Sequence, residues 1–503
     1  MTAYALLTKI SYSTMPESST WTPVARRRSR LIELRQWANK LAPNYSKWRT
    51  KNQYFHSADQ AYLRFLVQEE QRVIEVGCGT GHMLAALKPQ YGVGLDLSPE
   101  MIQIAADSHP ELHFFILDAE NSEGLSTVRN LGPFDVILLD STLGFLSDIQ
   151  QFLNELSPLC HQDTRLVVTS HSYLWEPLFS LATLLRLRLS TPPITWLRLS
   201  DIENLLKLGG FETVKQESRL ISPYRFLGIG SLFNRFIATL PFIQKAGFRQ
   251  YLVARPISKT ENTRTLSASV VIPCRNEKGN VEAAVKRLPI FCQDLEIIFV
   301  EGHSEDSTWD EILRVQRLYV DRKISALKQP GMGKGDAVRA AFEIASGDVL
   351  IILDADLTVP PEDIPKFYDA IASGQGEFIN GSRMIYGMEE GAMRFLNRIA
   401  NHFFAKVFSY LLNQTYTDTL CGTKVLRRTH YQAISMNRTY FGDFDPFGDF
   451  DLIFGAARLH LKVVEIPIRY ASRVYGTTQI SRFRHGVLLF RMVIFAWRKL
   501  KAL

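Results

Sequence analysis

The fold of the first half of the chain is decided by the stretch RVIEVGCGTG (residues 72–81), in which an apolar run of strand length ends in three glycines spaced two apart. Gly77, Gly79 and Gly81 permit a tight turn and let a ligand approach the backbone closely. The helix expected from His82 would direct its first amides toward that ligand. The pattern therefore predicts a ligand-binding loop between a strand and a helix.

Short apolar runs of strand length continue along the chain, and stretches with helical periodicity separate them. In the first half we expect strands over residues 72–76, 92–95, 112–117, 134–139 and 166–169. In the second half we expect strands over residues 269–272, 296–300, 349–353, 378–380 and 463–467. Strands that alternate with helices are typical of a doubly wound parallel sheet. The predicted fold class is therefore α/β, with two sheets in two domains.

The length agrees with two domains, since 503 residues exceed the roughly 250–300 at which a single core stops growing. The polar, aperiodic stretch 257–268 predicts a linker. We expect a basic extension over 1–44, a first domain over 45–256 and a second domain over 269–503. An apolar fraction of 46% and a charged fraction of 22% are ordinary for a globular chain. They exclude a mostly disordered protein and a membrane protein with many spans.

The net charge of +7 is carried by the two ends of the chain. Residues 1–50 contain nine Lys and Arg against two acids, and residues 466–503 contain eight against none, so the body between them is net acidic. An acidic body argues against a nucleic-acid partner, whereas basic ends suit an anionic lipid surface. Five scattered cysteines without a CxxC pair indicate a reducing compartment and no disulfide framework.

Two carboxylates follow the next two expected strands. Asp96 comes 19 residues after Gly77, a separation that suits hydrogen bonds from a carboxylate to a ribose diol. Asp118 ends the third strand and could accept a hydrogen bond from an adenine amino group. A glycine-rich loop with such acids is expected to bind a nucleoside-containing cofactor.

Glu75 precedes the glycines, and the stretches GLDLS (94–98), DAE (118–120) and FDVILLD (134–140) follow them. Together these motifs resemble the class I S-adenosylmethionine (SAM)-dependent methyltransferases. The resemblance implies a Rossmann-like sheet and SAM as the cofactor. The residues that it implies for cofactor binding are Glu75, Gly77, Gly79, Gly81, Asp96 and Asp118. A dinucleotide-dependent oxidoreductase is the alternative.

The methyl acceptor is less well defined by the sequence. Methyl transfer from a sulfonium expels a neutral leaving group, so positioning can dominate the catalysis. Asp140, His171 and Tyr173 lie near expected strand ends and are candidates for the acceptor side. The apolar segments 174–189 and 227–248 form either a cap that packs on the domain, which we favour, or a lid over a hydrophobic substrate.

In the second half, the stretch GDVLIILDAD (347–356) is an apolar strand that ends in Asp354 and Asp356. Carboxylates at positions i and i+2 can hold one hard divalent cation, Mg²⁺ or Mn²⁺, at the edge of a sheet. Such an ion can bridge the diphosphate of a nucleotide sugar and neutralise charge as the sugar departs. Two solvated acids that cap a strand are the alternative.

Further stretches surround this motif in order: VVIPCRNE (270–277), VEGHSEDST (300–308), PGMGKGDAV (330–338), NGSR (380–383) and DTLCGTK (418–424). The set resembles the family 2 glycosyltransferases of GT-A fold, especially the dolichol-phosphate mannosyltransferase and polyprenyl-phosphate glycosyltransferase branch, over about residues 268–485. The residues that it implies for the nucleotide sugar are Pro273, Asn276, Glu277, Glu301, Lys334 and Asp354. Glu301 replaces the aspartate usual in the family, and Gly302 and His303 replace its Gly-Ser order, which leaves the preferred base open.

For the acceptor, the resemblance implies Asp418, Arg473 and Arg482, and it makes Lys424 a candidate to neutralise a phosphate. The two arginines could hold phosphates by paired hydrogen bonds. A solvated lysine at a strand end is the alternative for Lys424.

A sugar-hydroxyl acceptor would need a general base, and Asp449 or Asp451 is the candidate. A phosphate acceptor is already anionic and needs none. Because Asp443 and Asp445 lie nearby, an ordinary charged loop remains an alternative.

Residues 482–503 mix a strongly apolar sequence with six Lys and Arg. Such a sequence is too interrupted to span a bilayer and is typical of a helix that lies at a membrane interface. We therefore expect peripheral contact with the cytoplasmic face of a membrane through this C-terminal helix.

The sequence as a whole predicts a bifunctional, membrane-associated transferase of a glycolipid or cell-wall polysaccharide pathway. One domain would transfer methyl from SAM, and the other would transfer a sugar from a nucleotide sugar to a polyprenyl phosphate with inversion and a divalent metal. The alternatives are a glycosyltransferase that extends a glycan at a sugar hydroxyl, a non-catalytic SAM-binding scaffold domain, and a nucleic-acid methyltransferase.

Overall fold

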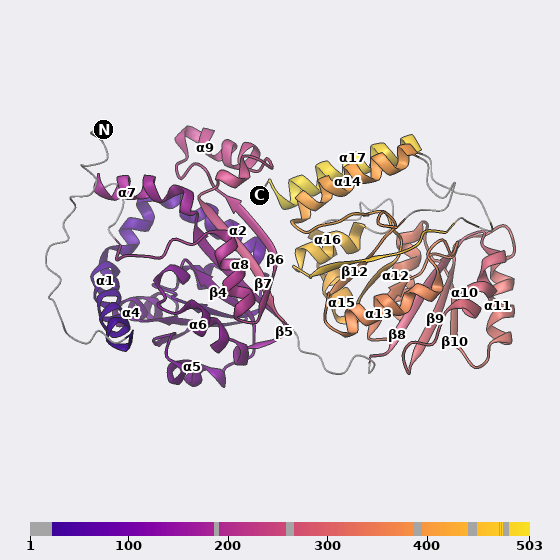
Figure 1. Ribbon diagram of the computed structural model, residues 1–503, viewed down its shortest axis with the longest axis horizontal. Coiled ribbons are helices and arrows are strands. Elements are labelled where there is room, and N and C mark those ends of the chain that lie inside the picture. The colour runs from indigo at the N-terminus through magenta and orange to yellow at the C-terminus, as the bar shows by residue number, and fades with distance from the viewer. Residues whose placement is uncertain are drawn as a thin grey trace.

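The computed structural model of the chain has two α/β halves, each built on one seven-stranded sheet (Figure 1). The residues that it describes are 23–185, 191–257, 266–386, 395–440, 450–471, 473, 475 and 482–502. The predicted fold class, two α/β sheets in succession, is confirmed.

The first sheet has the strand order β3-β2-β1-β4-β5-β7-β6. Its strands are β1 (Arg72–Val76), β2 (Tyr91–Asp96), β3 (His113–Ile116), β4 (Phe134–Asp140), β5 (Cys160–His171), β6 (Phe211–Arg219) and β7 (Arg249–Pro256). The five strands expected from the sequence are present and parallel. The sheet is nevertheless mixed, because β7 inserts between β5 and β6 and runs antiparallel to both.

The helices of this half are α1 (Pro23–Lys51), α2 (Gln53–Leu66), α3 (His82–Ala86), α4 (Pro99–Ser108), α5 (Ser122–Arg129), α6 (Ile149–Glu155), α7 (Glu176–Leu184), α8 (Leu199–Leu208) and α9 (Ile229–Leu232). Ser98 is the N-cap of helix α4, and its hydroxyl accepts a hydrogen bond from the Met101 amide at 3.1 Å. This cap satisfies an amide at the helix start and fixes Ser98 close to the end of β2.

Helix α1 begins within the basic extension expected over residues 1–44 and continues past residue 44. It packs on the first sheet's domain, because the Trp37 and Phe145 rings stack with centroids 5.8 Å apart. In addition, Ser98 Oγ donates a hydrogen bond to Asn39 Oδ1 at 2.6 Å, and Arg30 donates to the Gly144 carbonyl at 3.3 Å. The described part of the extension is therefore a packed helix rather than a solvated tail.

The second sheet has the order β10-β9-β8-β11-β13-β12-β14. Its strands are β8 (Ala268–Cys274), β9 (Leu295–Glu301), β10 (Lys323–Lys328), β11 (Val349–Ile352), β12 (Phe378–Ser382), β13 (Lys424–Arg427) and β14 (Val463–Pro467). All five expected strands are present. The unexpected strand β13 runs antiparallel to β11 and β12, and β10 adds a parallel edge strand beside β9.

The longer helices of this half are α10 (Val281–Arg287), α11 (Thr308–Leu318), α12 (Lys334–Ile344), α13 (Ile364–Ala372), α14 (Phe395–Leu412), α15 (Arg428–Met436), α16 (Phe450–Arg458) and α17 (Arg482–Leu500). Figure 1 shows α14 and α17 side by side along one edge of the molecule, and the two helices pack together. Among the residues that the structure describes, no helix is both long enough and apolar enough to cross a bilayer.

The two halves share a buried interface that is centred on Glu217 of β6. Its carboxylate accepts hydrogen bonds from Tyr62 at 2.5 Å and from Asn413 of the second half at 2.9 Å. It also pairs with Arg219 at 3.3 Å and with Lys501, beyond the end of α17, at 3.2 Å. Burial opposes ionisation of Glu217, yet the surrounding cations more than offset it and lower its pKa to about 2.

Further contacts extend this interface on both sides of Glu217. Arg165 of β5 pairs with Glu377 at 2.8 Å, and Arg458 donates to the Phe65 carbonyl at 2.6 Å. A continuous hydrophobic core contains Leu66 from the first half and Phe454 from the second. Because buried apolar, ionic and hydrogen-bonded contacts all cross the boundary, the two halves form one structural unit.

Glu217→Gln should lower the free energy of unfolding by about 3–5 kcal/mol, since it leaves buried cations without their counter-charge. Urea unfolding measures the change. Because the folded-state pKa of Glu217 lies below its ordinary value, its stabilisation is present above about pH 4.5 and is lost as the pH falls toward 2. As the pH falls from about 4.5 toward 2, the free energy of unfolding of the Glu217→Gln variant should therefore decrease less steeply than that of the wild type.

Glu362→Gln is the matched control, since it removes an exposed ion pair with Arg287 and should change stability by less than about 1 kcal/mol. An equal effect of the two substitutions would contradict the importance assigned to Glu217.

Candidate functional sites

The glycine-rich loop after β1 requires glycine at two positions and leaves the backbone open at the third. All three glycines have positive φ, +78° at Gly77, +52° at Gly79 and +72° at Gly81. A Cβ would lie 2.7 Å from Thr142 Oγ1 at Gly77 and 2.7 Å from the Phe114 ring at Gly81. At Gly79 it would meet no described atom within 4 Å. The loop is thus packed on both flanks and accessible to a ligand at its centre.

Asp96, at the end of β2, is held beside this loop. Its Oδ2 accepts a hydrogen bond from the Gly79 amide at 2.8 Å, and its Oδ1 accepts one from the Ser98 amide at 2.9 Å. Burial raises the pKa of Asp96, against the lowering effect of these amides. Each carboxylate oxygen retains capacity for another donor, so the pair could bind two hydroxyl groups of a ribose.

Glu75 lies at the other side of the loop and is 2% exposed. Its Oε2 has no hydrogen-bond partner among the described residues. Burial and the nearby Asp140 raise the pKa of Glu75 well above its ordinary value. A buried carboxyl with an unpartnered oxygen next to an open backbone fits a polar or cationic group of a bound cofactor.

Helix α1 borders the same site, which the sequence did not reveal. Arg27 lies 3.5 Å from Asp118 Oδ2, and the other oxygen of Asp118 accepts from the Glu120 amide at 3.0 Å. Desolvation raises the pKa of Tyr45 on α1, and the charges of Asp140 and Asp96 raise it further. The helix therefore adds side chains to the edge of the sheet that carries the glycine loop.

In the second half, Asp354 and Asp356 follow β11 and each faces a cation. Lys334, at the start of α12, lies 2.7 Å from Asp354 Oδ1. Arg473 contacts Asp356 Oδ2 at 2.7 Å and Glu277 Oε1 at 3.1 Å. The sequence positions 277, 334, 354, 356 and 473 thus meet at the carboxyl edge of the second sheet.

The carboxylate of Asp354 is half-buried and faces several cations. Burial opposes its ionisation, but Lys334, Lys424 and Arg383 more than offset this and lower its pKa. The backbone of Gly422 approaches it closely, since a Cβ there would lie 1.8 Å from Asp354 Oδ2. Only glycine fits at this contact between the loop before β13 and the end of β11.

The loop after β8 and the loop after β9 lie beside these carboxylates and are joined by hydrogen bonds. The Asn276 amide donates to Ser304 Oγ at 3.0 Å, and Asn276 Oδ1 accepts from the Glu305 amide at 2.8 Å. Glu301 is buried and accepts from the Ser304 amide at 2.5 Å. Pro273 lies just before them on β8. These contacts fix the loops predicted to border a nucleotide.

Two family models match the chain in its two halves. Residues 49–216 match the model described as a methyltransferase domain, and residues 269–435 match the model of glycosyl transferase family 2. The first half of the chain is thus similar to a methyltransferase domain, and the second half is similar to family 2 glycosyltransferases. The resemblances stated from the sequence are thereby confirmed.

The second half of the chain is similar to curated proteins that are named as sugar transferases. A dolichol-phosphate mannosyltransferase of Pyrococcus furiosus is 30% identical over 240 residues, which are 47% of this chain and 64% of the relative. An undecaprenyl-phosphate 4-deoxy-4-formamido-L-arabinose transferase of Aeromonas hydrophila is 34% identical over 22% of this chain and 36% of the relative. A dolichyl-phosphate hexose transferase of Haloferax volcanii is 29% identical over 45% of this chain and 92% of the relative. The chain thus spans less than two thirds of the length of the first two.

In the glycosyltransferase domain, Asp418 lies below the surface, where it holds Arg383. The two side chains form a paired contact at 2.6 and 2.8 Å, and Asn401 of α14 donates to Asp418 at 3.0 Å. Lys424 is buried, and its ammonium donates to the Cys421 carbonyl. The structure thus excludes a solvated lysine at this strand end. The motif NGSR (380–383) contains Arg383, but the motif alone did not indicate a role for this residue.

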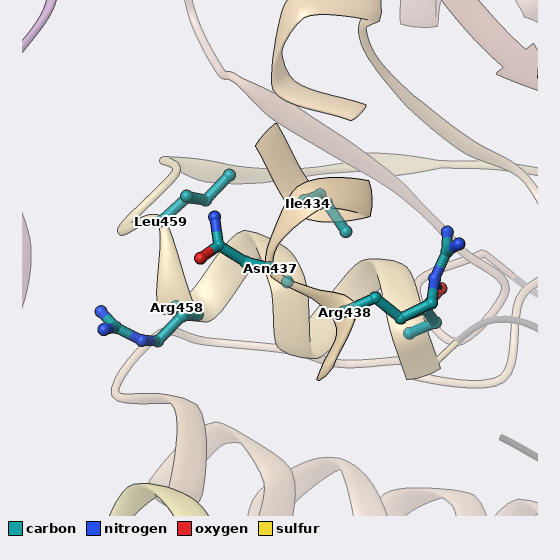
Figure 2. Close-up of a pocket in the computed structure, with 7 residues that line it drawn as sticks. Ile434, Asn437, Arg438, Arg458 and Leu459 are labelled. Atoms are coloured by element: carbon teal, nitrogen blue, oxygen red, sulfur yellow. Dashed lines mark hydrogen bonds and ion pairs between the residues drawn. The ribbon is translucent and has the colours of Figure 1, made fainter. Parts of the chain in front are cut away.

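Asp451 lies at the start of α16, in a small pocket that Figure 2 shows between α15 and α16. Its Oδ2 accepts a hydrogen bond from Arg438 Nε at 2.9 Å, so the carboxylate is already ion-paired. The neighbouring candidate Asp449 lies outside the described residues, as do Asp443 and Asp445. The backbone of Arg482 begins α17, but its side chain lies outside the description.

In the methyltransferase domain, Asp140 belongs to a buried ionic network. Arg249 contacts it and also binds Asp59 through two nitrogens, at 3.1 and 2.9 Å. Thr169 Oγ1 donates to Asp140 at 2.6 Å. Burial opposes ionisation of Asp140, but Arg249 outweighs it and lowers the pKa. Asp140 therefore stabilises the sheet edge as an ion-paired carboxylate.

His171, the last residue of β5, lies within an aromatic cluster. Its ring centroid lies 5.5 Å from that of Phe179, 6.4 Å from that of Phe55 and 6.4 Å from that of Phe248. Tyr173 lies just beyond, with the Arg198 guanidinium 4.6 Å from its ring. His171 and the glycine loop lie at the same edge of the sheet, because β1, β4 and β5 are parallel.

The apolar segments after β5 and β6 pack on the domain through one side only. Phe179 and Phe248 belong to the aromatic cluster, as a cap would require. Leu184, Leu227 and Phe242 are instead 79%, 105% and 88% exposed. The expectation that these segments simply pack on the domain is therefore only half correct.

Gly422→Ala should strongly lower the sugar transfer expected of this half of the chain, because the added Cβ would displace Asp354 from its contacts with Lys334. The expected loss is at least about 100-fold in kcat/KM, the effect of removing a few kcal/mol of transition-state stabilisation. Gly486→Ala is the matched control, since a Cβ there meets no described atom within 4 Å. Circular dichroism checks that both variants fold, and normal transfer by a folded Gly422→Ala enzyme would contradict the prediction.

Proposed function

We propose that the glycosyltransferase domain transfers a sugar from a nucleotide sugar to a polyprenyl phosphate. The observation that carries the proposal is the set of cations and carboxylates formed by Asp354 with Lys334 and by Asp356 with Arg473. Cations next to carboxylates suit a diphosphate leaving group and a phosphate acceptor. The relatives' names support this acceptor class, since they refer to dolichol phosphate and undecaprenyl phosphate.

Asp354 and Asp356 are also suited to hold Mg²⁺ or Mn²⁺, because both supply hard oxygen ligands at one strand end. Such an ion would neutralise charge on the departing diphosphate. Lys334 and Arg473 contact these two carboxylates, so both cations lie beside the proposed site of the ion and the diphosphate. Lys334 and Arg473 would then orient the diphosphate and the acceptor.

A phosphate acceptor agrees with the state of Asp451 better than a hydroxyl acceptor does. An anionic phosphate oxygen attacks the anomeric carbon without a base, whereas a hydroxyl must lose a proton. Asp451 is already bound by Arg438, so its Oδ2 is engaged and not aimed at an acceptor hydroxyl. The alternative, extension of a glycan at a sugar hydroxyl, would depend on Asp449.

For the first domain we propose transfer of a methyl group from SAM. The unpartnered oxygen of Glu75, the open backbone at Gly79 and the fixed carboxylate of Asp96 together fit its ammonium, its amino-acid moiety and its ribose. SAM would supply an electrophilic methyl group, and the residues of the site would bind and orient it. A SAM-binding scaffold without methyl transfer is the second candidate.

We propose that the protein acts as a peripheral protein at the cytoplasmic face of a membrane. Val487, Phe490 and Ile494 of α17 are exposed, and the exposed Arg491 lies between the last two, as in helices that lie at a lipid interface. The other face of α17 is buried, with Met492 and Ala496 in the core. The five cysteines are all free, which suits a reducing compartment.

Asp354→Asn and Asp356→Asn should each lower sugar transfer by at least about 100-fold, because each removes charge from the proposed metal and diphosphate site. Transfer is measured with labelled nucleotide sugars and polyprenyl phosphate. EDTA should abolish the wild-type reaction, and Mg²⁺ or Mn²⁺ should restore it. The matched control is Asp369→Asn on the exposed side of α13. Undiminished turnover in both site variants would refute the assignment.

Asp96→Ala should weaken SAM binding by about 10–100-fold, because charge-assisted hydrogen bonds contribute about 1.5–3 kcal/mol. Isothermal titration calorimetry measures the affinity, and sugar transfer by the same variant should be unchanged. Asp107→Ala, on the exposed side of α4, serves as the control. Binding of SAM with wild-type affinity by Asp96→Ala would show that the ribose is bound elsewhere.

A further inference from the structure

Both domains expose large apolar side chains on elements that carry no catalytic motif. In the methyltransferase domain, Leu178 on α7 is exposed, as are Leu227 and Phe242 in the segment between β6 and β7. In the glycosyltransferase domain, Phe403 of α14 and Phe490 of α17 are exposed. Contiguous apolar surface of this kind marks an interaction site.

Direct contacts join these elements into one surface. Trp175, just before α7, donates a hydrogen bond to the Ala246 carbonyl at 2.8 Å, which links α7 to the segment between β6 and β7. That segment meets the end of α17, since the Phe236 and Trp497 rings lie 5.7 Å apart and Arg235 donates to the Ala502 carbonyl at 3.1 Å. Helix α17 in turn packs on α14, and Figure 1 shows α7, α9, α14 and α17 along one side of the molecule.

The stretches of sequence from which this surface is built are rich in basic residues and poor in acids. The stretches 174–185, 220–248, 395–412 and 482–502 contain eleven Lys and Arg and a single acid, Glu176. Exposed bases stand between the apolar side chains, among them Arg225, Lys245, Lys406 and Arg491. Apolar side chains interspersed with bases match the boundary of an anionic bilayer, where the former enter the acyl region and the latter meet the headgroups.

The surface adjoins both candidate sites. Helix α7 follows His171, which ends β5 at the edge of the sheet that holds the glycine loop. Helix α14 reaches the second site through Asn401, which binds Asp418 beneath Arg383. An acceptor anchored in one lipid layer could therefore approach either site.

We infer that α7, the segment 220–248, α14 and α17 form one docking surface for an anionic lipid bilayer, and that the methyl acceptor is a lipid-linked molecule presented from that bilayer. The inference rests on the proposed methyl and sugar transfers and extends them. The methyltransferase domain contributes its own part of the membrane contact. Its methyl acceptor would lie in the same bilayer as the acceptor of the sugar.

The membrane contact is tested with Leu227→Glu/Phe242→Glu, which places two acids in the methyltransferase part of the surface. Both side chains are exposed, so the fold should be retained. The matched control is Ile290→Glu/Val320→Glu, two exposed apolar side chains that precede β9 and β10 and so lie at the opposite edge of the second sheet. Deletion of α17 is unsuitable, because its buried face and Lys501 hold the two halves together.

Flotation is measured with vesicles of phosphatidylcholine alone and of phosphatidylcholine with phosphatidylglycerol. The full chain should bind the anionic vesicles, and Leu227→Glu/Phe242→Glu should reduce this partition at least about tenfold, whereas the control pair should not. Wild-type affinity of the Leu227→Glu/Phe242→Glu variant, or equal binding of the wild type to neutral and anionic vesicles, would overturn the docking surface.

The acceptor class is tested with methyl-labelled SAM and a crude cell extract that is split into chloroform-soluble and aqueous fractions. Label should enter the chloroform-soluble products, and Asp96→Ala should lower this incorporation at SAM concentrations below the affinity of the variant. Label confined to the aqueous products would overturn the lipid-linked acceptor but leave methyl transfer intact. Binding of SAM without label in either fraction would refute the proposed methyl transfer itself.

Discussion

The structure depends on a buried carboxylate that both halves of the chain share. Glu217 lies at the junction of the two domains and is surrounded by Tyr62 and Arg219 from its own half and by Asn413 and Lys501 from the other. A charge buried at such a place is tolerated only when its partners come close with good geometry. This requirement fixes the C-terminal end of α17 against β6 and so determines how the domains meet.

The two sites use the same device, a glycine that brings backbone against a carboxylate. The amide of Gly79 binds Asp96, and the absence of a side chain at Gly422 lets its loop pass directly over Asp354. In both cases the carboxylate is held by named contacts at the carboxyl edge of a sheet. Such pre-organisation reduces the free energy that binding must spend on ordering the site.

The interface also gives the fusion a physical consequence. Because Glu217 and the shared core fix the domains together, the exposed apolar faces of α7, α14 and α17 lie along one side of the molecule. Two independent domains on a flexible linker would have no common orientation toward a bilayer. A single rigid unit can present both sheet edges to one lipid surface, which suits successive reactions on lipid-linked molecules.

The sequence alone determined the ten strands with clear apolar runs and the motif residues at their ends, because these signals are local. It did not determine β7, because this strand begins with the polar residues Arg249 and Gln250. These side chains can be buried in the folded protein since partners that are remote in sequence, such as Asp59, bind Arg249. It also could not determine that α1 packs on the glycine-loop domain or that Arg438 pairs with Asp451. Tertiary structure decided these features, since the contacts that stabilise them join residues that no local pattern relates.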